Sequence, residues 1–139
     1  MTLLIDADWL IYSSCCSCEQ DVKWDENLHT LHCDERDIHE MIDGRVEYYQ
    51  KIAEDNDDVV MCFTQYPTFR HTIFPDYKAN RKNKRKPLAL YAMVEQIGQR
   101  YKSASYTGLE GDDVMALLAT SKQYPNPVIV SPDKDMRTV

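Results

Sequence analysis

Acidic side chains gather in three short motifs of this 139-residue chain, and their carboxylates are the groups best placed to do chemistry. Two of the motifs directly follow apolar runs, and the third opens a helix. The motifs are Asp6-Ala7-Asp8, Asp133-Lys134-Asp135 and Glu110-Gly111-Asp112-Asp113. In an open α/β sheet the ligand crevice lies beyond the carboxyl ends of the strands. We therefore expect the three motifs to meet at one edge of a sheet.

Carboxylates that converge in this way repel one another, and their pKa values rise. Divalent cations with hard oxygen ligands relieve the repulsion, so Mg²⁺ or Mn²⁺ suits such a site. For any single acid, a helix cap or a solvated loop is the better explanation, because a helix dipole favours acids in its first turn. The whole set instead predicts metal binding. Glu110, Asp113, Val114 and Leu117 share one helical stripe by their spacing, which predicts that Asp113 lies at the top of a buried face.

The bases of the chain are concentrated in one segment. Residues 1–69 have a net charge of −12, residues 70–102 of +7 and residues 103–139 of −2, which makes −7 overall. A charge run is usually a solvated face, but the acidity of the remaining chain makes this separation informative. Lysine and arginine neutralise backbone phosphates, and Phe74 or Tyr77 could stack on an unpaired base, worth ~1–3 kcal/mol. We expect this segment to face the carboxylates, and metal ions beside a phosphate-binding segment favour phosphodiester hydrolysis.

Alternating apolar patterns predict the elements that position these groups. Strands are predicted near residues 3–5, 59–63, 104–106 and 128–130. Longer helices are predicted at 34–56, 87–101 and 110–122, with a short helix or turn at 9–12 and a hairpin at 22–32. Asp34 is the expected N-cap of the first long helix, and Pro87 the expected first turn of the second. This order implies an α/β fold, a three-layer sandwich with a mostly parallel central sheet.

Length and composition describe one ordinary globular domain. The chain is 43% hydrophobic and 28% charged, and its mean hydropathy is −0.55. No apolar run approaches the ~20 residues that a bilayer span needs. The first ten residues carry acids where a signal peptide needs bases, and five cysteines are an odd number for a disulfide framework. We therefore expect a cytoplasmic protein with reduced thiols and no membrane partner.

Four ordered strings resemble the motifs of phage 5′→3′ exonucleases and flap endonucleases, which share a PIN-like (resolvase-like) N-terminal domain. The resemblance runs from Thr2 to Thr138 and is weakest over 13–56. The strings are Ile5-Asp6-Ala7-Asp8-Trp9-Leu10, Pro75-Asp76-Tyr77-Lys78-Ala79-Asn80-Arg81-Lys82, Leu109-Glu110-Gly111-Asp112-Asp113-Val114-Met115 and Ser131-Pro132-Asp133-Lys134-Asp135. Together they form a specific signal, whereas any one of them alone would be weak.

The resemblance implies a single PIN-like domain over residues 1–139 that cleaves DNA at 5′ ends, flaps or duplexes, or the RNA strand of hybrids, with two Mg²⁺ or Mn²⁺ ions. The implied metal ligands, direct or through water, are Asp6, Glu110, Asp112, Asp113, Asp133 and Asp135. Lys78 and Arg81 match the catalytic basic pair that steers and stabilises the scissile phosphate. The residues expected to bind nucleic acid are Tyr77, Lys78, Arg81, Lys82, Lys84, Arg85 and Lys86.

Two departures from the family pattern qualify this expectation. Many relatives have an aspartate after the second strand, where this chain has Thr64-Gln65, so one metal contact is lost or made through water. The family also continues with further aspartates and a helical module that grips duplex DNA, whereas this chain stops at Val139. We expect a domain without that C-terminal part, with a second polypeptide as one way to complete the nuclease. If the chain is phage-encoded, its compartment is the host cytoplasm.

Three alternatives come from other classes. A haloacid-dehalogenase-like phosphatase would use Asp6 and Asp8 as nucleophile and acid/base, but it leaves the Glu110–Asp113 motif without a role. A non-catalytic nucleic-acid-binding remnant would bind in a salt-sensitive manner without cleavage. A zinc site is the weakest alternative, because only one Cys-x-x-Cys is present. Its ligands would be Cys15, Cys18, His29, and His32 or Cys33.

Overall fold

A four-stranded parallel sheet forms the centre of the molecule in the computed structural model, which describes residues 2–53, 58–73, 76 and 85–138. The strand order is β5-β4-β1-β6, and each neighbouring pair is parallel. The strands are β1 (Thr2–Asp6), β4 (Val59–Cys62), β5 (Ser103–Ala104) and β6 (Pro127–Val130). This arrangement confirms the predicted parallel sheet. It also places the carboxyl ends of β1, β4 and β6 at the same edge.

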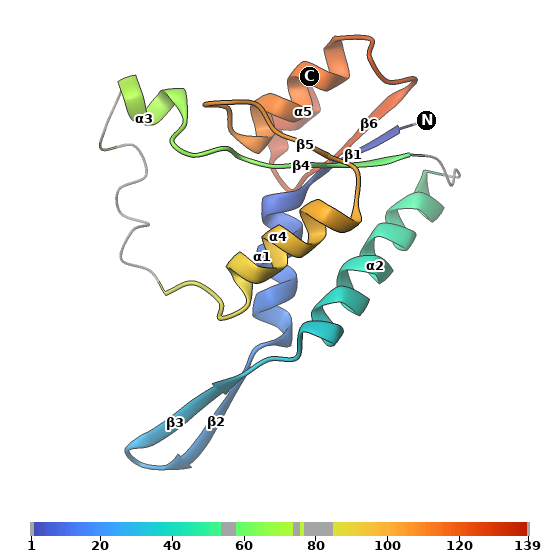
Figure 1. Cartoon of the computed structure of the whole chain (residues 1–139). Helices are drawn as coiled ribbons and strands as arrows, with labels where there is room; N and C mark the ends of the chain where they lie inside the picture. Colours follow the sequence, from blue (N-terminus) through green and yellow to red (C-terminus); the bar gives the residue numbers. More distant parts are fainter. Residues whose placement is uncertain (1, 54–57, 74–75, 77–84, 139) are drawn as a thin grey trace.

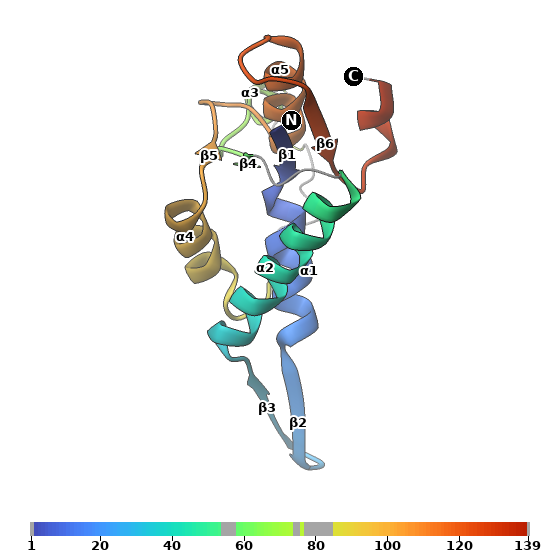
Figure 2. The same ribbon diagram turned by 90° about the vertical axis from the view of Figure 1, so that its right-hand side faces the viewer.

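Helices cover both faces of the sheet and make three layers (Figures 1 and 2). One face is covered by α1 (Ala7–Cys18), α2 (Glu35–Ile52) and α4 (Leu90–Arg100), and the other by α5 (Gly111–Thr120). Successive side chains of a strand point to opposite faces. Accordingly Leu3 and Ile5 pack in the larger core with α1, while Leu4 packs in the smaller core with α5. The three-layer α/β prediction is confirmed.

Two of the helices, α1 and α2, begin at an aspartate that caps their first turn. The Asp6 carboxylate accepts a hydrogen bond from the Trp9 amide (3.3 Å), so the chain turns from β1 into α1 at this residue. The Asp34 carboxylate accepts one from the Arg36 amide (2.9 Å) and caps α2 as predicted. Because Asp6 is both the cap of α1 and the last residue of β1, its carboxylate lies at the carboxyl end of this central strand.

Several predicted boundaries are wrong. The short helix or turn at 9–12 is the twelve-residue α1, and α2 ends at Ile52, before residues 54–57, which lie outside the described part. Pro87 lies in a turn before α4 and accepts a hydrogen bond from the Leu90 amide (3.2 Å). Two short helices were not predicted, α3 (Phe69–Ile73) and the 3-10 helix η2 (Lys134–Thr138). Short helices have too few residues for an apolar period to be visible.

The predicted stripe of α5 is right at Val114 and wrong at Leu117. Leu117 is exposed, and the helix packs through Val114, Met115 and Leu118 instead. The prediction takes the stripe that contains the acids Glu110 and Asp113 as the buried face of the helix. That stripe includes Leu117 but not Leu118. The real contact face begins at Gly111, which is buried against the sheet edge.

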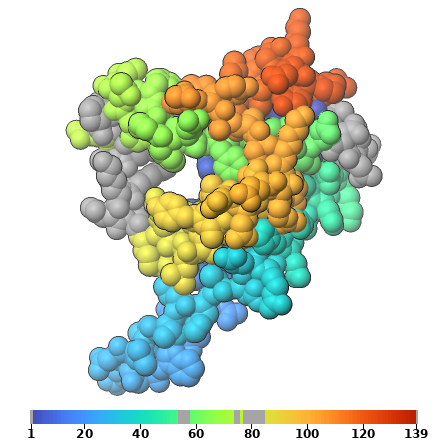
Figure 3. Space-filling view, viewed as in Figure 1, coloured from blue at the N-terminus to red at the C-terminus, as the bar shows by residue number. Residues whose placement is uncertain are grey.

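A two-stranded hairpin projects from the body, as Figures 1 and 3 show. Strands β2 (Gln20–Asp25) and β3 (Leu28–His32) pair antiparallel, which confirms the predicted hairpin. The side chains of Trp24 and Leu28 are exposed near its tip. His29 contacts Asp21, and His32 contacts Thr30 on the same strand. None of the described helices has the length and apolar character to cross a membrane.

Candidate functional site

The carboxylates at the end of β1 are tied to the neighbouring strand ends. The Ser131 hydroxyl, which follows β6, donates to Asp6 Oδ2 (3.4 Å). The Thr64 amide, which follows β4, donates to Asp8 Oδ2 (2.8 Å). Both acids therefore lie at the predicted edge of the sheet. Thr64 is one of the two residues where we expect a departure from the family pattern, and its backbone amide holds an acid in place.

Helix α5 begins against the same edge. The Gly111 amide donates to Thr64 Oγ1 (2.9 Å), which seats the first turn of the helix beside β4. A Cβ atom at Gly111 would lie 3.3 Å from Asp8 Oδ2 and 3.4 Å from the Cys62 carbonyl oxygen. Both distances are tighter than an ordinary contact of a Cβ atom, so a larger residue here would force its neighbours to shift by a few tenths of an ångström. The close approach brings the two residues that flank Gly111, Glu110 and Asp112, next to the acids that follow β1.

The carboxylates that meet here raise one another's proton affinity. The pKa of Asp6 rises from 3.8 to about 6, chiefly because the group is buried and further because Asp112 and Asp8 are nearby. Burial also raises the pKa of Asp8, and the charge of Glu110 adds to the effect. Crowded oxygen donors of this kind suit a hard divalent cation. Among the described residues, however, no three histidine, cysteine or acidic side chains form a ready metal centre, so metal binding stays a prediction.

Asp113 is compensated by an arginine that is not among the predicted site residues. Arg70 Nη1 donates to Asp113 Oδ2 (2.6 Å) and Nη2 to Oδ1 (3.1 Å), and Nη1 lies 3.6 Å from Glu110 Oε2. These bonds to Arg70 lower the pKa of Asp113. Arg70 belongs to the basic segment, but nothing in its local sequence sets it apart from the other bases. The pairing of Arg70 with Asp113 arises because the fold brings α3 next to the start of α5.

The last acidic motif leads away from this edge. Ser131 Oγ accepts from the Asp133 amide (3.1 Å), and Asp133 Oδ1 accepts from the Asp135 amide (2.9 Å). Asp133 is thus linked to Asp6 through one serine. Asp135 is exposed in the first turn of η2. Their predicted role as metal ligands stays a prediction.

Most of the predicted nucleic-acid-binding residues cannot be placed. Lying outside the described residues are Phe74, Tyr77, Lys78, Arg81, Lys82 and Lys84. The last two predicted positions are described, and both contact neighbouring side chains. Arg85 forms an ion pair with Glu19, whose Oε2 also accepts from the Leu88 amide (2.9 Å). Lys86 donates to the Tyr91 hydroxyl (3.1 Å).

These two bases do not face the carboxylates. Glu19 is the C-cap of α1 and Asp6 is its N-cap, so the full helix separates them. At a rise of 1.5 Å per residue the distance is about 20 Å. The expectation that the basic segment faces the acids therefore does not hold for Arg85 and Lys86. Their predicted contacts with nucleic acid stay predictions.

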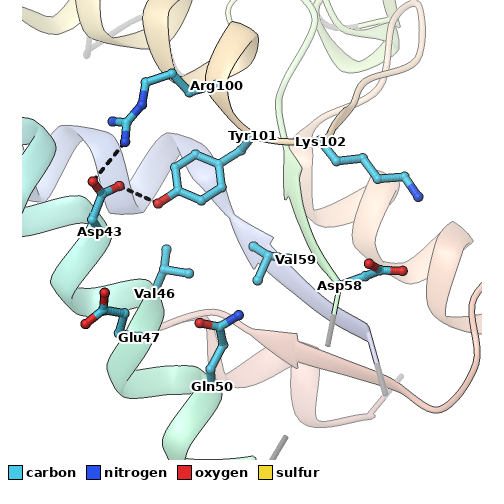
Figure 4. A pocket seen from close by; sticks show the side chains of 9 residues that line it. All are labelled: Asp43, Val46, Glu47, Gln50, Asp58, Val59, Arg100, Tyr101 and Lys102. Carbon is cyan, nitrogen blue, oxygen red and sulfur yellow. Dashed lines mark hydrogen bonds and ion pairs between the residues drawn. The ribbon is translucent and has the colours of Figure 1, made fainter. Parts of the chain in front are cut away.

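A groove of about 660 Å³ lies at the opposite edge of the sheet, by the amino ends of β4 and β5 (Figure 4). Three of its polar side chains pair with one another. Arg100 Nη2 donates to Asp43 Oδ2 (2.8 Å), and the Tyr101 hydroxyl donates to Asp43 Oδ1. We place the candidate site at the carboxyl edge despite the size of this groove, because acids crowd together at the carboxyl edge, whereas Asp43 in the groove is compensated by Arg100 and Tyr101.

Comparison with known proteins agrees with this geometry. Residues 1–139 match the family described as the 5′-3′ exonuclease, N-terminal resolvase-like domain. The chain belongs to this family. It is 30% identical over 145 residues to the exodeoxyribonuclease of Enterobacteria phage T3 and to the exonuclease of Escherichia phage T7, which covers 99% of this chain and 48% of each relative. A flap endonuclease Xni of a Shewanella species is 39% identical over 71 residues, covering 48% of the chain and 27% of that protein.

The family membership confirms the resemblance and the resolvase-like fold. The chain spans about half the length of the phage relatives that it matches. No solved structure matches it. The phosphatase alternative loses its support, because the match to the exonuclease family includes the acidic motif of α5 that a phosphatase leaves unused. Zinc binding also gains no support, since the described histidines and cysteines form no metal-holding group.

Proposed function

We propose that this chain is the nuclease domain of a divalent-metal-dependent 5′→3′ exonuclease or flap endonuclease that hydrolyses DNA phosphodiester bonds. One observation carries the proposal. The acids at the end of β1 and the start of α1 converge with the acids that open α5 at the carboxyl edge of the sheet, in a chain that belongs to an exonuclease family. Acids that raise one another's pKa are costly to keep together. A bound cation offsets that cost.

The proposed cation ligands are the six acids of the three motifs, direct or through water, holding two Mg²⁺ or Mn²⁺ ions. They are Asp6, Glu110, Asp112, Asp113, Asp133 and Asp135. When bound, such ions activate water and neutralise charge on the phosphate. Asp8 has a different role in this proposal. Its bond to the Thr64 amide joins the first turn of α1 to the segment after β4 and keeps the neighbouring acids in register with α5.

The basic segment supplies the proposed grip on DNA. Lys78 and Arg81 orient the scissile phosphate and stabilise the charge that develops on it. The DNA backbone is bound by Tyr77, Lys82, Lys84, Arg85 and Lys86. Since this binding depends on phosphate charge, we expect it to weaken steeply as salt rises.

The test is cleavage of a 5′-labelled flap and a 5′-labelled duplex by the purified chain, with Mg²⁺ or with EDTA. We expect cleavage in Mg²⁺, none in EDTA, and a loss of cleavage in Glu110→Gln. Cleavage that persists in EDTA would contradict the metal dependence. Salt-sensitive binding with no cleavage would instead favour the non-catalytic remnant. Repeating the assay with the product of an adjacent reading frame tests whether a second polypeptide completes the nuclease.

A further inference from the structure

Arg70 occupies the carboxylates that the proposed function assigns to metal. Its two terminal nitrogens bind both oxygens of Asp113, at 2.6 and 3.1 Å, and one of them lies 3.6 Å from Glu110. Asp113 Oδ2 also accepts from the Glu110 amide (3.2 Å). Both oxygens of Asp113 are therefore engaged in hydrogen bonds. A cation that bound Asp113 directly would have to displace the guanidinium.

The position of Arg70 is held by the backbone around it. The Phe69 amide donates to the Gly108 carbonyl (2.7 Å), and the Gln65 amide donates to the Leu109 carbonyl (3.0 Å). Gly108 has a φ of +79°, a conformation that glycine adopts readily. The turn that leads into α5 thus carries the start of α3 with it.

The guanidinium is further supported by stacking. The Arg70 Cζ atom lies 4.5 Å from the centroid of the Phe69 ring. The Arg70 side chain is 34% exposed and that of Asp113 is 26% exposed, so the pair is partly shielded from water. Bidentate pairs between arginine and a carboxylate are strong and geometrically specific. Two hydrogen bonds therefore hold the Arg70 guanidinium against Asp113.

We propose that Arg70 is the built-in counter-ion of Glu110 and Asp113, and that it lowers the affinity of the site for divalent cations by competing for these carboxylates. The inference rests on the proposed function. It assigns to a residue outside the acidic motifs the control of how tightly they hold metal. Without metal, the guanidinium offsets the repulsion between the two acids.

The test is calorimetric titration of the full chain with Mn²⁺. In Arg70→Gln, which removes the charge but keeps hydrogen-bond donors, we expect Mn²⁺ to bind about tenfold more tightly than in the wild type, or about 1.4 kcal/mol. Arg70→Lys keeps the charge and should change the affinity by less than about threefold. Arg100→Gln breaks a similar pair with Asp43 at the other edge and should change nothing.

A second measurement separates this role from a merely structural one. In EDTA the melting temperature of Arg70→Gln should fall below that of the wild type, and saturating Mg²⁺ should raise it by more than it raises the wild type. Unchanged or weaker Mn²⁺ binding in Arg70→Gln, beside normal binding in the wild type and in Arg100→Gln, would overturn the counter-ion role and leave the proposed function standing. Absence of Mn²⁺ binding in every protein would overturn both.

Discussion

The two edges of the sheet treat their acids in opposite ways. At the amino edge, Asp43 is paired with Arg100 and Tyr101 across the groove between α2 and α4. Although partial burial opposes ionisation, these bonds leave the pKa of Asp43 below its usual value. At the carboxyl edge, Asp6 has acids as its charged neighbours, and its pKa is raised to about 6. No ion pair among the described residues involves Asp6.

The difference separates acids that stabilise the fold from acids that cost stability. A compensated carboxylate joins two helices and needs no ligand. A crowded one is tolerated only if another requirement keeps it there, and strongly perturbed groups cluster at functional sites for this reason. The first turn of α5 combines the two cases, since Arg70 compensates Asp113 while Asp112 adds to the charge near Asp6. The carboxyl edge is therefore where we expect mutations to change activity most.

The largest expected effect is a difference in cleavage rate between variants at the two edges. Asp112→Asn should lower Mg²⁺-dependent flap cleavage at least about a hundredfold, because it removes a charge from the proposed cation site. Asp43→Asn should leave cleavage within about twofold. Initial rates at saturating DNA measure both. Equal losses in the two variants would show that the contrast between the edges has no bearing on catalysis.

At Asp6, unlike at a paired acid, removal of the charge should stabilise the fold. Because its folded pKa of about 6 exceeds the ordinary 3.8, the folded state holds a proton more tightly than the unfolded state, and ionisation above pH 6 destabilises the fold. Asp6→Asn keeps a capping side chain for α1 and should raise the free energy of unfolding by about 1–2 kcal/mol at pH 8 without metal, after allowing for solvent.

That gain should fade as pH falls through 6 and be absent near pH 4. Urea unfolding at the three pH values, in EDTA, measures it. A gain that was independent of pH would mean that packing, rather than charge, explains the effect.

The glycine that seats α5 allows a sharper test of geometry. Gly111→Ala would bring a methyl group to 3.3 Å from Asp8 Oδ2 and should lower cleavage about tenfold by shifting that carboxylate. Gly98→Ala, within α4, meets nothing within 4 Å and serves as the control. It should stabilise the fold by about 0.5–1 kcal/mol and leave cleavage unchanged. Normal cleavage by Gly111→Ala would show that the tight seat is not needed.

The smallest expected effect lies at the amino edge. Asp43→Asn should lower the free energy of unfolding by about 1 kcal/mol at pH 7, since it weakens the bonds to Arg100 and Tyr101 in a partly exposed site. The lowered pKa of Asp43 means that its contribution is present above its unfolded value of about 4 and is lost as pH falls through the folded value. Urea unfolding at pH 7 and pH 3 checks this window, which is opposite to that of Asp6.

Sequence patterns predict the sheet and its edge better than they predict the contacts at that edge. Continuous apolar runs such as Val128-Ile129-Val130 are long enough to mark buried strands, and parallel strands share a carboxyl edge by necessity. Asp6 and the start of α5 could therefore be placed together in advance. The face of α5 could not, because acids in its first turn obscure the apolar phase. Arg70 could not either, since its pairing with Asp113 depends on a short helix 43 residues away.

Helix α1 sets a fixed distance between two parts of the molecule. It begins at the acid edge and ends at Glu19, which holds Arg85 and the backbone of Leu88. Because α1 packs along the core and cannot stretch, the spacing between its two ends stays near 20 Å. With bases stacked 3.4 Å apart, that spacing corresponds to about six nucleotides of a strand. A DNA strand that contacted both ends of the helix at once would therefore place about six nucleotides between the two contacts.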